Sequence, residues 1–147
     1  MEKVTTILDK KQSHFNKISS GSTLSDAFGR MSNQNMEYLS VIDDDERFLG
    51  LLTEHDIARK TFNNNQSPDE INVKEIMNTK IPFANIDDSI EYCILLMKQY
   101  HIHYLPVFES FSFRGIISSD DLLEKAIQSR EGIFDRQDEE KELHYSY

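Results

Sequence analysis

Apolar residues along this chain form a helical pattern that occurs twice. The first set has the spacing i, i+3, i+4 and i+7 and comprises Leu24, Ala27, Phe28 and Met31. The same spacing returns 66 residues later at Ile90, Cys93, Ile94 and Met97. Each set is the apolar stripe of an amphipathic helix that covers a core. The pattern therefore predicts helices over about residues 23–32 and 89–100.

Three further segments are repeated in the same order and with nearly the same separation. They are VTTIL at 4–8 with VKEIM at 73–77, YLSVI at 38–42 with YLPVF at 104–108, and GLLTEHDI at 50–57 with GIISSDDL at 115–122. The second pair is typical of buried strands, and the third of a strand that runs into a helix. Four echoes in one order indicate an internal duplication.

Each copy predicts a short lead-in turn, a strand, a helix, two strands joined by a polar turn, and a closing helix. The first strands fall around Phe15–Ile18 and Ile81–Ile86, and the closing helices begin near Thr53 and Ser118. A single copy of about 60 residues is marginal as an independent fold. We therefore expect the two copies to share one core in a mixed α/β (α+β) fold.

The chain is divided by a polar, asparagine-rich linker that has the composition of a loop. We expect three parts: the first copy at residues 1–66, the second copy at 67–130, and an acidic C-terminal tail at 131–147. The tail is rich in charge and poor in apolar residues, which is typical of a solvated segment.

Composition narrows the classes of function. The 147 residues include 16 basic and 26 acidic ones, which gives a net charge of −10. That charge argues against binding to nucleic acid or to anionic lipid. The sequence contains no run of about 18 apolar residues, and its start lacks the pattern of a signal peptide. With the single cysteine, Cys93, placed on an apolar stripe, we expect a soluble cytoplasmic protein with an inert core thiol.

Two short motifs mark the starts of the closing helices, Thr53-x-x-Asp56 and Ser118-x-x-Asp121. Both have the capping-box pattern, in which a hydroxyl and a carboxylate satisfy the first backbone amides. The same position suits a ligand, because a helix N-terminus attracts phosphate and a carboxylate accepts hydrogen bonds from a ribose diol. The residues alone leave both interpretations open.

With these motifs the sequence resembles a tandem pair of cystathionine-β-synthase (CBS) domains, a Bateman module. The resemblance covers about residues 1–130 and rests on GLLTEHD at 50–56, YLPV at 104–107 and GIISSDD at 115–121. It implies two β-α-β-β-α units packed with pseudo-two-fold symmetry. It also implies a regulatory module that binds AMP, ADP, ATP, S-adenosylmethionine or NAD(H) in the cleft between the copies and signals by conformational change.

The resemblance also implies roles for particular residues. Asp56 and Asp121 would hold the ribose, and Thr53 and Ser118 would contact phosphate or ribose. The adenine would be lined by Phe15–Ile18, by Ile81–Ala84, with Ile81 and Phe83 foremost, and by His103 and Tyr104.

The sequence departs from the family pattern in two places. Ser40 stands where the family often has proline, in the adenine-facing wall of the first copy. His101 and His103 take the place of a basic residue that meets phosphate, and we expect His101 to close the preceding helix. The cations that remain for phosphate are Arg59, one turn into the closing helix, and, less well placed, Lys80 and Arg114. The two clefts need not be equally occupied.

Other chemistry has weaker support in the sequence. The five histidines lack the spacing of a zinc site, and the acidic run at 43–46 lacks the glycine and distal glutamate of a calcium loop. No nucleophile, phosphate-loop or dinucleotide motif accompanies them. We therefore predict no enzyme, no catalytic residue and no metal. The alternative function is a ligand-free structural or partner-binding disc. In either case we expect a homodimer formed through apolar helix faces and an unidentified regulated protein as partner.

Overall fold

The computed structural model of the chain describes residues 2–10, 16–34, 36–61 and 65–128. The elements of the first half are α1 (Thr5–Lys10), β1 (Lys17–Ser19), α2 (Leu24–Gln34), β2 (Tyr38–Ile42), β3 (Phe48–Thr53) and α3 (Glu54–Thr61). Those of the second half are α4 (Val73–Ile76), β4 (Ala84–Asn85), α5 (Ile90–Tyr100), β5 (Tyr104–Glu109), β6 (Ser112–Ser118) and a closing helix over residues 119–128. The predicted acidic tail and Phe15 lie outside the described residues.

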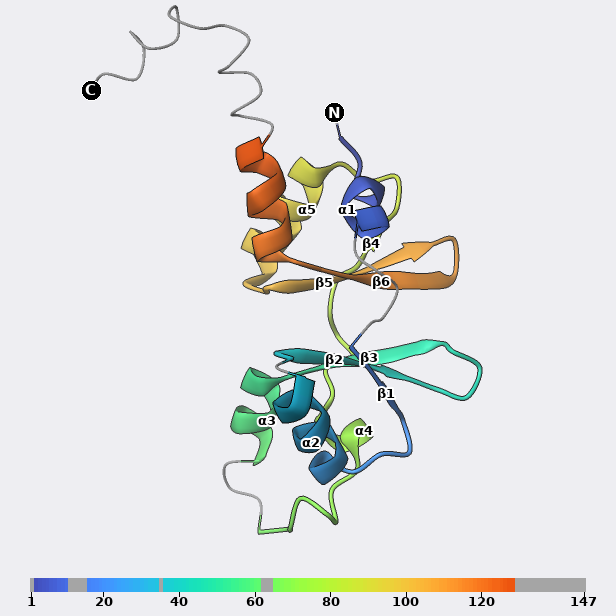
Figure 1. Cartoon of the computed structure of the whole chain (residues 1–147), viewed down its shortest axis with the longest axis vertical. Helices are drawn as coiled ribbons and strands as arrows, with labels where there is room; N and C mark the ends of the chain where they lie inside the picture. Colours follow the sequence, from blue (N-terminus) through green and yellow to red (C-terminus); the bar gives the residue numbers. More distant parts are fainter. Residues whose placement is uncertain (1, 11–15, 35, 62–64, 129–147) are drawn as a thin grey trace, which may run out of the picture.

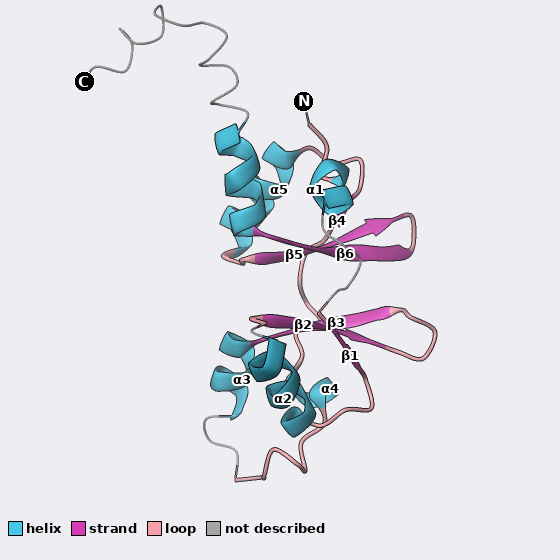
Figure 2. Cartoon of the chain, viewed as in Figure 1, coloured by secondary structure: helices cyan, strands magenta, loops and turns pink. Residues whose placement is uncertain are grey.

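Two three-stranded sheets of the same design stand at the centre of the molecule. Their strand orders are β1-β2-β3 and β4-β5-β6, with the first pair of each sheet parallel and the second antiparallel. Both antiparallel pairs shift register at matching positions, after Val41 and after Val107. The sheets face each other, and the helices cover their outer faces (Figure 1 and Figure 2). This arrangement confirms the predicted mixed fold with pseudo-two-fold symmetry.

The two lead-in helices are exchanged between the halves. α1 lies with the second sheet and α4 lies with the first (Figure 1). Matching backbone hydrogen bonds hold them: Val4 N–H donates to Asp88 O at 2.9 Å, and Val73 N–H donates to Ser22 O at 3.0 Å. One core therefore includes Val4, Ile7 and Leu8 with residues of β4–β6 and α5, whereas the other includes Ile71, Val73 and Ile76 with residues of β1–β3 and α2. The described residues therefore form two cores rather than the single shared core expected from the sequence, because each sheet is covered by its own helices, and each core is completed by the other sequence copy.

The first strand of the second copy is shorter than the predicted Ile81–Ile86 and covers Ala84–Asn85. The preceding segment pairs with β3 instead, where Leu51 and Asn78 exchange backbone hydrogen bonds of 3.0 and 2.8 Å. Gly50 permits this approach, because a Cβ there would lie 2.9 Å from Met77 Sδ and 3.0 Å from Asn78 O. The linker after α4 is thereby fixed against the first sheet.

Ser40 occupies a fully buried position on β2. Its side chain is 0% exposed, and its Oγ has no hydrogen-bond partner within the described part of the chain. A buried hydroxyl without a partner costs free energy. We expect Ser40→Ala to leave the free energy of unfolding unchanged or to raise it by up to about 1 kcal/mol, as measured by urea denaturation. A clear loss of stability would show that the hydroxyl has a partner after all.

Cys93 lies on the buried face of α5 and is 0% exposed. Burial, with a smaller contribution from Asp88, raises the pKa of the Cys93 thiol to about 12. Because the thiolate is the reactive form, we expect no labelling by thiol reagents at about pH 8 in the folded chain and rapid labelling in denaturant. In the unfolded chain the thiol has its ordinary pKa of about 9, so there it loses its proton at a lower pH than in the folded chain. The free energy of unfolding should therefore fall as the pH rises above about 9, and it should fall less in Cys93→Ala. Rapid labelling of the folded chain would contradict this assignment.

None of the helices within the described ranges has the length and apolar character needed to cross a membrane.

Candidate functional site

The first candidate junction lies where β3 runs into α3. Thr53 sits directly before the helix, and Asp56 N–H donates to Thr53 Oγ1 at 3.1 Å. The Thr53 hydroxyl in turn donates to Asp56 Oδ2 at 2.9 Å. Asp56 is 6% exposed, and its Oδ1 lies 4.0 Å from the Arg59 guanidinium. A buried carboxylate needs partners, and this geometry leaves Asp56 with acceptor capacity beyond the hydroxyl it already accepts from.

The second junction, between β6 and the closing helix, repeats the bond from the aspartate N–H to the hydroxyl, but here the aspartate carboxylate accepts from a backbone N–H. Asp121 N–H donates to Ser118 Oγ at 3.1 Å, and Ser118 N–H donates to Asp121 Oδ2 at 2.8 Å. These two bonds form the reciprocal capping box that the Ser-x-x-Asp spacing predicts. Both candidate carboxylates therefore have a structural role, and any ligand would share them with the helix N-terminus.

A cleft of about 520 Å³ opens beside the first junction. Its walls come from both copies, because β3 and α3 supply one side and the segment from Tyr100 to Tyr104 supplies the other. Six residues predicted from the sequence line it: Thr53, Asp56, Arg59, Ile81, His103 and Tyr104. Their role in binding stays a prediction, but the fold brings them to one place from three separate segments.

Four other predicted residues have different surroundings. Ser118 and Asp121 form the second junction, and Phe15 is outside the described residues. The Phe83 ring packs edge-on against Phe108 with centroids 5.3 Å apart, in a cluster with Phe48 and Phe113. Phe83 does not line the cleft beside Asp56, so the structure gives it a contact between the two β-hairpins, and its predicted contact with adenine stays a prediction.

The remaining basic candidates also differ in position. Arg114 forms an ion pair with Glu109 on the β5–β6 hairpin, away from the cleft. Lys80 is exposed and does not line the cleft. His101 ends α5 in a left-handed conformation with φ of 54°, as expected for a helix-closing residue, and its side chain also lines the cleft. Among the residues that line the cleft, Arg59 is thus the one lysine or arginine.

Sequence reasoning missed Glu37, which also lines this cleft. The Tyr104 hydroxyl donates to Glu37 Oε2 at 2.6 Å and so joins the two copies. Burial, followed by this hydrogen bond, raises the pKa of Tyr104 above its usual value. The 66-residue repeat places Glu37 at the position equivalent to His103, and this correspondence was the signal that could have identified it.

Two tyrosines connect the two junctions. The rings of Tyr38 and Tyr104, which are equivalent in the repeat, lie 4.7 Å apart. Burial raises the pKa of Tyr38 to about 12, and the Asp121 carboxylate adds to this effect. Tyr38 pairs across the strands with Thr53, and Tyr104 pairs with Ser118. The contact between the two rings therefore joins strand positions that lie next to the two junctions.

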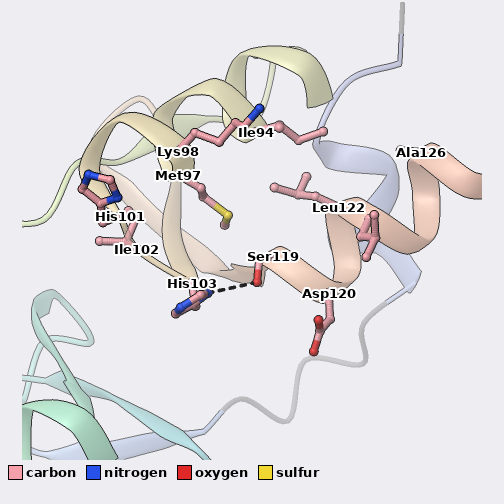
Figure 3. Close-up of a pocket in the computed structure, with 11 residues that line it drawn as sticks. Ile94, Met97, Lys98, His101, Ile102, His103, Ser119, Asp120, Leu122 and Ala126 are labelled. Carbon is pink, nitrogen blue, oxygen red and sulfur yellow. Dashed lines mark hydrogen bonds between the residues drawn. The ribbon is translucent and has the colours of Figure 1, made fainter.

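An apolar groove lies on the outer surface of the second half, between α5 and the closing helix. It has a volume of about 500 Å³, and its walls include Ile94, Met97, Leu122 and Leu123. Figure 3 shows these walls, with Ser119 and His103 at the lower edge. A more polar hollow on the first half lies between α2 and α3, where Phe28, Met31 and Ile57 share the walls with Glu37, Glu54 and Thr61. Both halves thus have apolar side chains between two helices, and the second half has the more apolar groove.

The family model for the CBS domain matches residues 12–62 and again 73–127. The chain therefore belongs to the CBS-domain family and contains two copies of the domain. A pair of such domains is a regulatory, ligand-binding module, and proteins of this family are generally regulatory rather than catalytic.

Individual relatives agree with this assignment. The chain is 27% identical over 110 residues to a homoserine O-acetyltransferase of Methanococcus vannielii, matching 74% of this chain but 22% of that enzyme. The chain thus spans about a fifth of that relative's length. The crystal structure of the CBS domain NE2398 superposes with a TM-score of 0.79 and 28% identity, covering 86% of this chain and 99% of that one.

A further solved structure shares the fold. It is the CBS domain pair of protein MJ0100, in complex with 5′-methylthioadenosine and S-adenosyl-L-methionine, with a TM-score of 0.73 and 21% identity. The match covers 88% of this chain and 98% of that chain.

Proposed function

We propose that this chain is a cytoplasmic regulatory module that binds an adenosine-containing ligand in the cleft between its two CBS domains. The observation that carries the proposal is the buried Asp56 carboxylate, which keeps acceptor capacity at the edge of a cleft of about 520 Å³. A carboxylate at such a position accepts hydrogen bonds from both hydroxyls of a ribose. The free, buried Cys93 agrees with a reducing compartment.

The cleft walls supply the other contacts that a nucleoside needs. Thr53 offers its hydroxyl beside Asp56, while Ile81 and Tyr104 offer apolar and aromatic surface for a base. Asp121 and Ser118 are the equivalent carboxylate and hydroxyl at the second junction. The related CBS pair of MJ0100 holds two adenosyl compounds, which supports the same ligand class here.

Ligand binding would act on the relative packing of the two copies. The cleft takes one wall from each copy, and the Tyr104–Glu37 hydrogen bond crosses between them. A ligand shifts such an equilibrium by the difference in its affinity for the two arrangements. A regulated protein would then recognise the altered surface.

The test is a thermal-shift panel with AMP, ADP, ATP, S-adenosylmethionine and NAD(H), with guanosine nucleotides as the matched control. A ligand that binds the folded chain stabilises it by about 2.7 kcal/mol at a concentration of 100 times its Kd. We expect at least one adenosine compound to raise the melting temperature and the guanosine compounds to leave it unchanged. No shift with any adenosine compound would favour the alternative, a ligand-free disc that binds a partner protein.

We also propose that the module is a homodimer that buries its outward helix pairs. Leu123, in the apolar groove of the second half, is 59% exposed, and Phe28, in the hollow of the first half, is 43% exposed. Leu95 on α5 is also 59% exposed. Apolar patches of this kind mark interfaces. Because both halves carry an equivalent patch, a two-fold axis lets two copies of the chain cover all four helix pairs.

Light scattering tests the dimer. We expect a dimer mass for the natural chain and a monomer mass for Leu123→Glu, which places a charge in the groove. Phe111→Glu is the matched control, because Phe111 is 99% exposed at the tip of the β5–β6 hairpin and away from the helix pairs. A monomer mass for the natural chain at micromolar concentration contradicts the proposal.

A further inference from the structure

Carboxylates outnumber cations in the walls of the cleft beside Asp56. Glu37, Glu54 and Asp56 contribute three negative charges, and Arg59 contributes one positive charge. The Arg59 guanidinium already lies 4.0 Å from Asp56 Oδ1. In the described part of the chain, no lysine or arginine forms an ion pair with Glu37 or Glu54. His55, His101 and His103 also line the cleft, but among its carboxylate, lysine and arginine side chains the balance is negative and opposes a phosphate.

The Glu37 carboxylate is held in place for a ligand. The Tyr104 hydroxyl donates to one of its oxygens at 2.6 Å. A carboxylate has about four lone-pair sites, so a single hydrogen bond leaves it able to accept from or pair with a cationic group. Tyr100 and Tyr104 add aromatic rings to the same wall, and aromatic faces attract cations. Fixed carboxylates and aromatic faces together form an environment for positive charge.

Acidic residues also outnumber basic ones at the second junction, which has no arginine at the position equivalent to Arg59. The 65-residue shift that relates Asp56 to Asp121 places Glu124 at the position equivalent to Arg59, and Asp120 precedes Asp121. Within the described residues of the closing helix, Lys125 is the one basic residue, and it pairs with Glu2 at 3.3 Å. Both junctions are therefore poor in free positive charge.

We infer that, within the adenosyl class named under the proposed function, the ligand carries no phosphate and bears a positive group, a sulfonium or an ammonium, on the substituent of its ribose. This inference rests on the proposed function and narrows it. Glu37 and Glu54 hold the positive group, while Asp56 holds the ribose. Arg59 is left for the carboxylate of an amino-acid substituent, which would give the ligand charges of both signs that match the cleft.

Isothermal titration of the full chain at about pH 8, where imidazoles carry little charge, tests the inference. The probes are S-adenosylmethionine, neutral 5′-methylthioadenosine, AMP and ATP. We expect S-adenosylmethionine to bind about tenfold or more tightly than AMP, and ATP to bind most weakly. Added salt should weaken the binding of S-adenosylmethionine and improve that of AMP, because screening reduces both attraction and repulsion.

The possible results separate the two proposals. If AMP or ATP binds as tightly as S-adenosylmethionine, the inference about charge is overturned while the adenosyl site stands. If none of the four binds, the proposed function is overturned and the inference falls with it. If S-adenosylmethionine binds no more tightly than methylthioadenosine, the sulfonium and its substituent add nothing to the affinity. The part of the inference that excludes a phosphate then stands, and the part that requires a positive group is rejected.

Two variants link the preference to named residues. Glu37→Gln keeps the shape and an oxygen that can accept from the Tyr104 hydroxyl but removes the charge, so it should weaken the binding of S-adenosylmethionine by about three- to tenfold and strengthen that of AMP. Glu70→Gln makes the same change of net charge on an exposed loop outside the cleft and should leave both affinities unchanged. Glu124→Arg, on an exposed helix position, should increase the binding of AMP. Equal behaviour of the Glu37 and Glu70 variants overturns the inference.

Discussion

Asp56→Ala and Asp121→Ala are each expected to weaken the binding of an adenosyl ligand by about 1.5–3 kcal/mol, the range for a hydrogen bond to a charged group. Asp56 is buried at the edge of the cleft and retains acceptor capacity, so its loss removes a ribose contact that water does not replace. The fold should survive, since losing a helix cap costs about 0.5–2 kcal/mol. Titration calorimetry measures the affinity and thermal melting measures the stability.

The chain contains a matched control for this pair. Asp26 accepts from Thr23 N–H at 2.9 Å, and its own N–H donates to Thr23 Oγ1 at 3.2 Å, so it caps α2 through the same Thr-x-x-Asp motif. It does not line the cleft. Asp26→Ala should therefore lower stability by a similar amount and leave ligand affinity unchanged. Unchanged affinity in both the Asp56 and the Asp121 variants would remove the proposed site.

Ile76→Ala should loosen the first sheet although Ile76 belongs to the second sequence copy. Ile76 is 3% exposed and packs in the core formed with β1–β3 and α2. Truncation of a buried isoleucine costs about 2–5 kcal/mol through lost burial and the cavity left behind. Amide hydrogen exchange should show the larger loss of protection in β1–β3, because local opening reports the nearest weakened core.

Ile7→Ala is the reciprocal experiment. Ile7 is 7% exposed in the core formed with β4–β6 and α5, so its loss should be seen mainly in the second sheet. Ile57→Ala provides the control, since Ile57 is buried in the first core and belongs to the first copy. It should give the same pattern as Ile76→Ala. If the Ile76 variant instead exposes β4–β6, the exchange of the lead-in helices is wrong.

The sequence allowed the repeated design to be predicted because its determinants are local. The stripes that begin at Leu24 and Ile90 specify two amphipathic helices, and the structure places α2 and α5 there with most of each stripe buried, although Phe28 is 43% exposed. The strands before Thr53 and Ser118 follow from short apolar runs bounded by polar turns. Periodicity and capping act within a few residues, so they can be read from the sequence directly.

The exchange of α1 and α4 could not be read in the same way. Val4 and Val73 are apolar in either arrangement, and nothing in their own segments states which sheet they cover. That choice depends on the path of the connecting segments and on packing between residues far apart in the sequence, such as the Leu51–Asn78 pairing. The same limit explains why no strand begins at Ile81, because Asn78, which precedes it, pairs with Leu51 on β3.

The candidate site was predicted where the two copies carry the same motif and was missed where equivalent positions differ. Thr53 and Asp56 could be selected because Ser118 and Asp121 repeat them. Glu37 stands at the position equivalent to His103, so a search for identical residues in the two copies passed over it. The difference between the copies, rather than their likeness, holds the information about charge in the cleft.

The exchanged lead-in helices make the two copies depend on each other. α1 covers β4–β6 and α4 covers β1–β3, so neither copy alone carries a complete core in this arrangement. Two separate single-copy chains would have to trade these segments, as in a domain-swapped pair. In one polypeptide the exchange is intramolecular, so the effective concentration of each lead-in helix at its core is set by the length of the connecting chain rather than by the concentration of the protein.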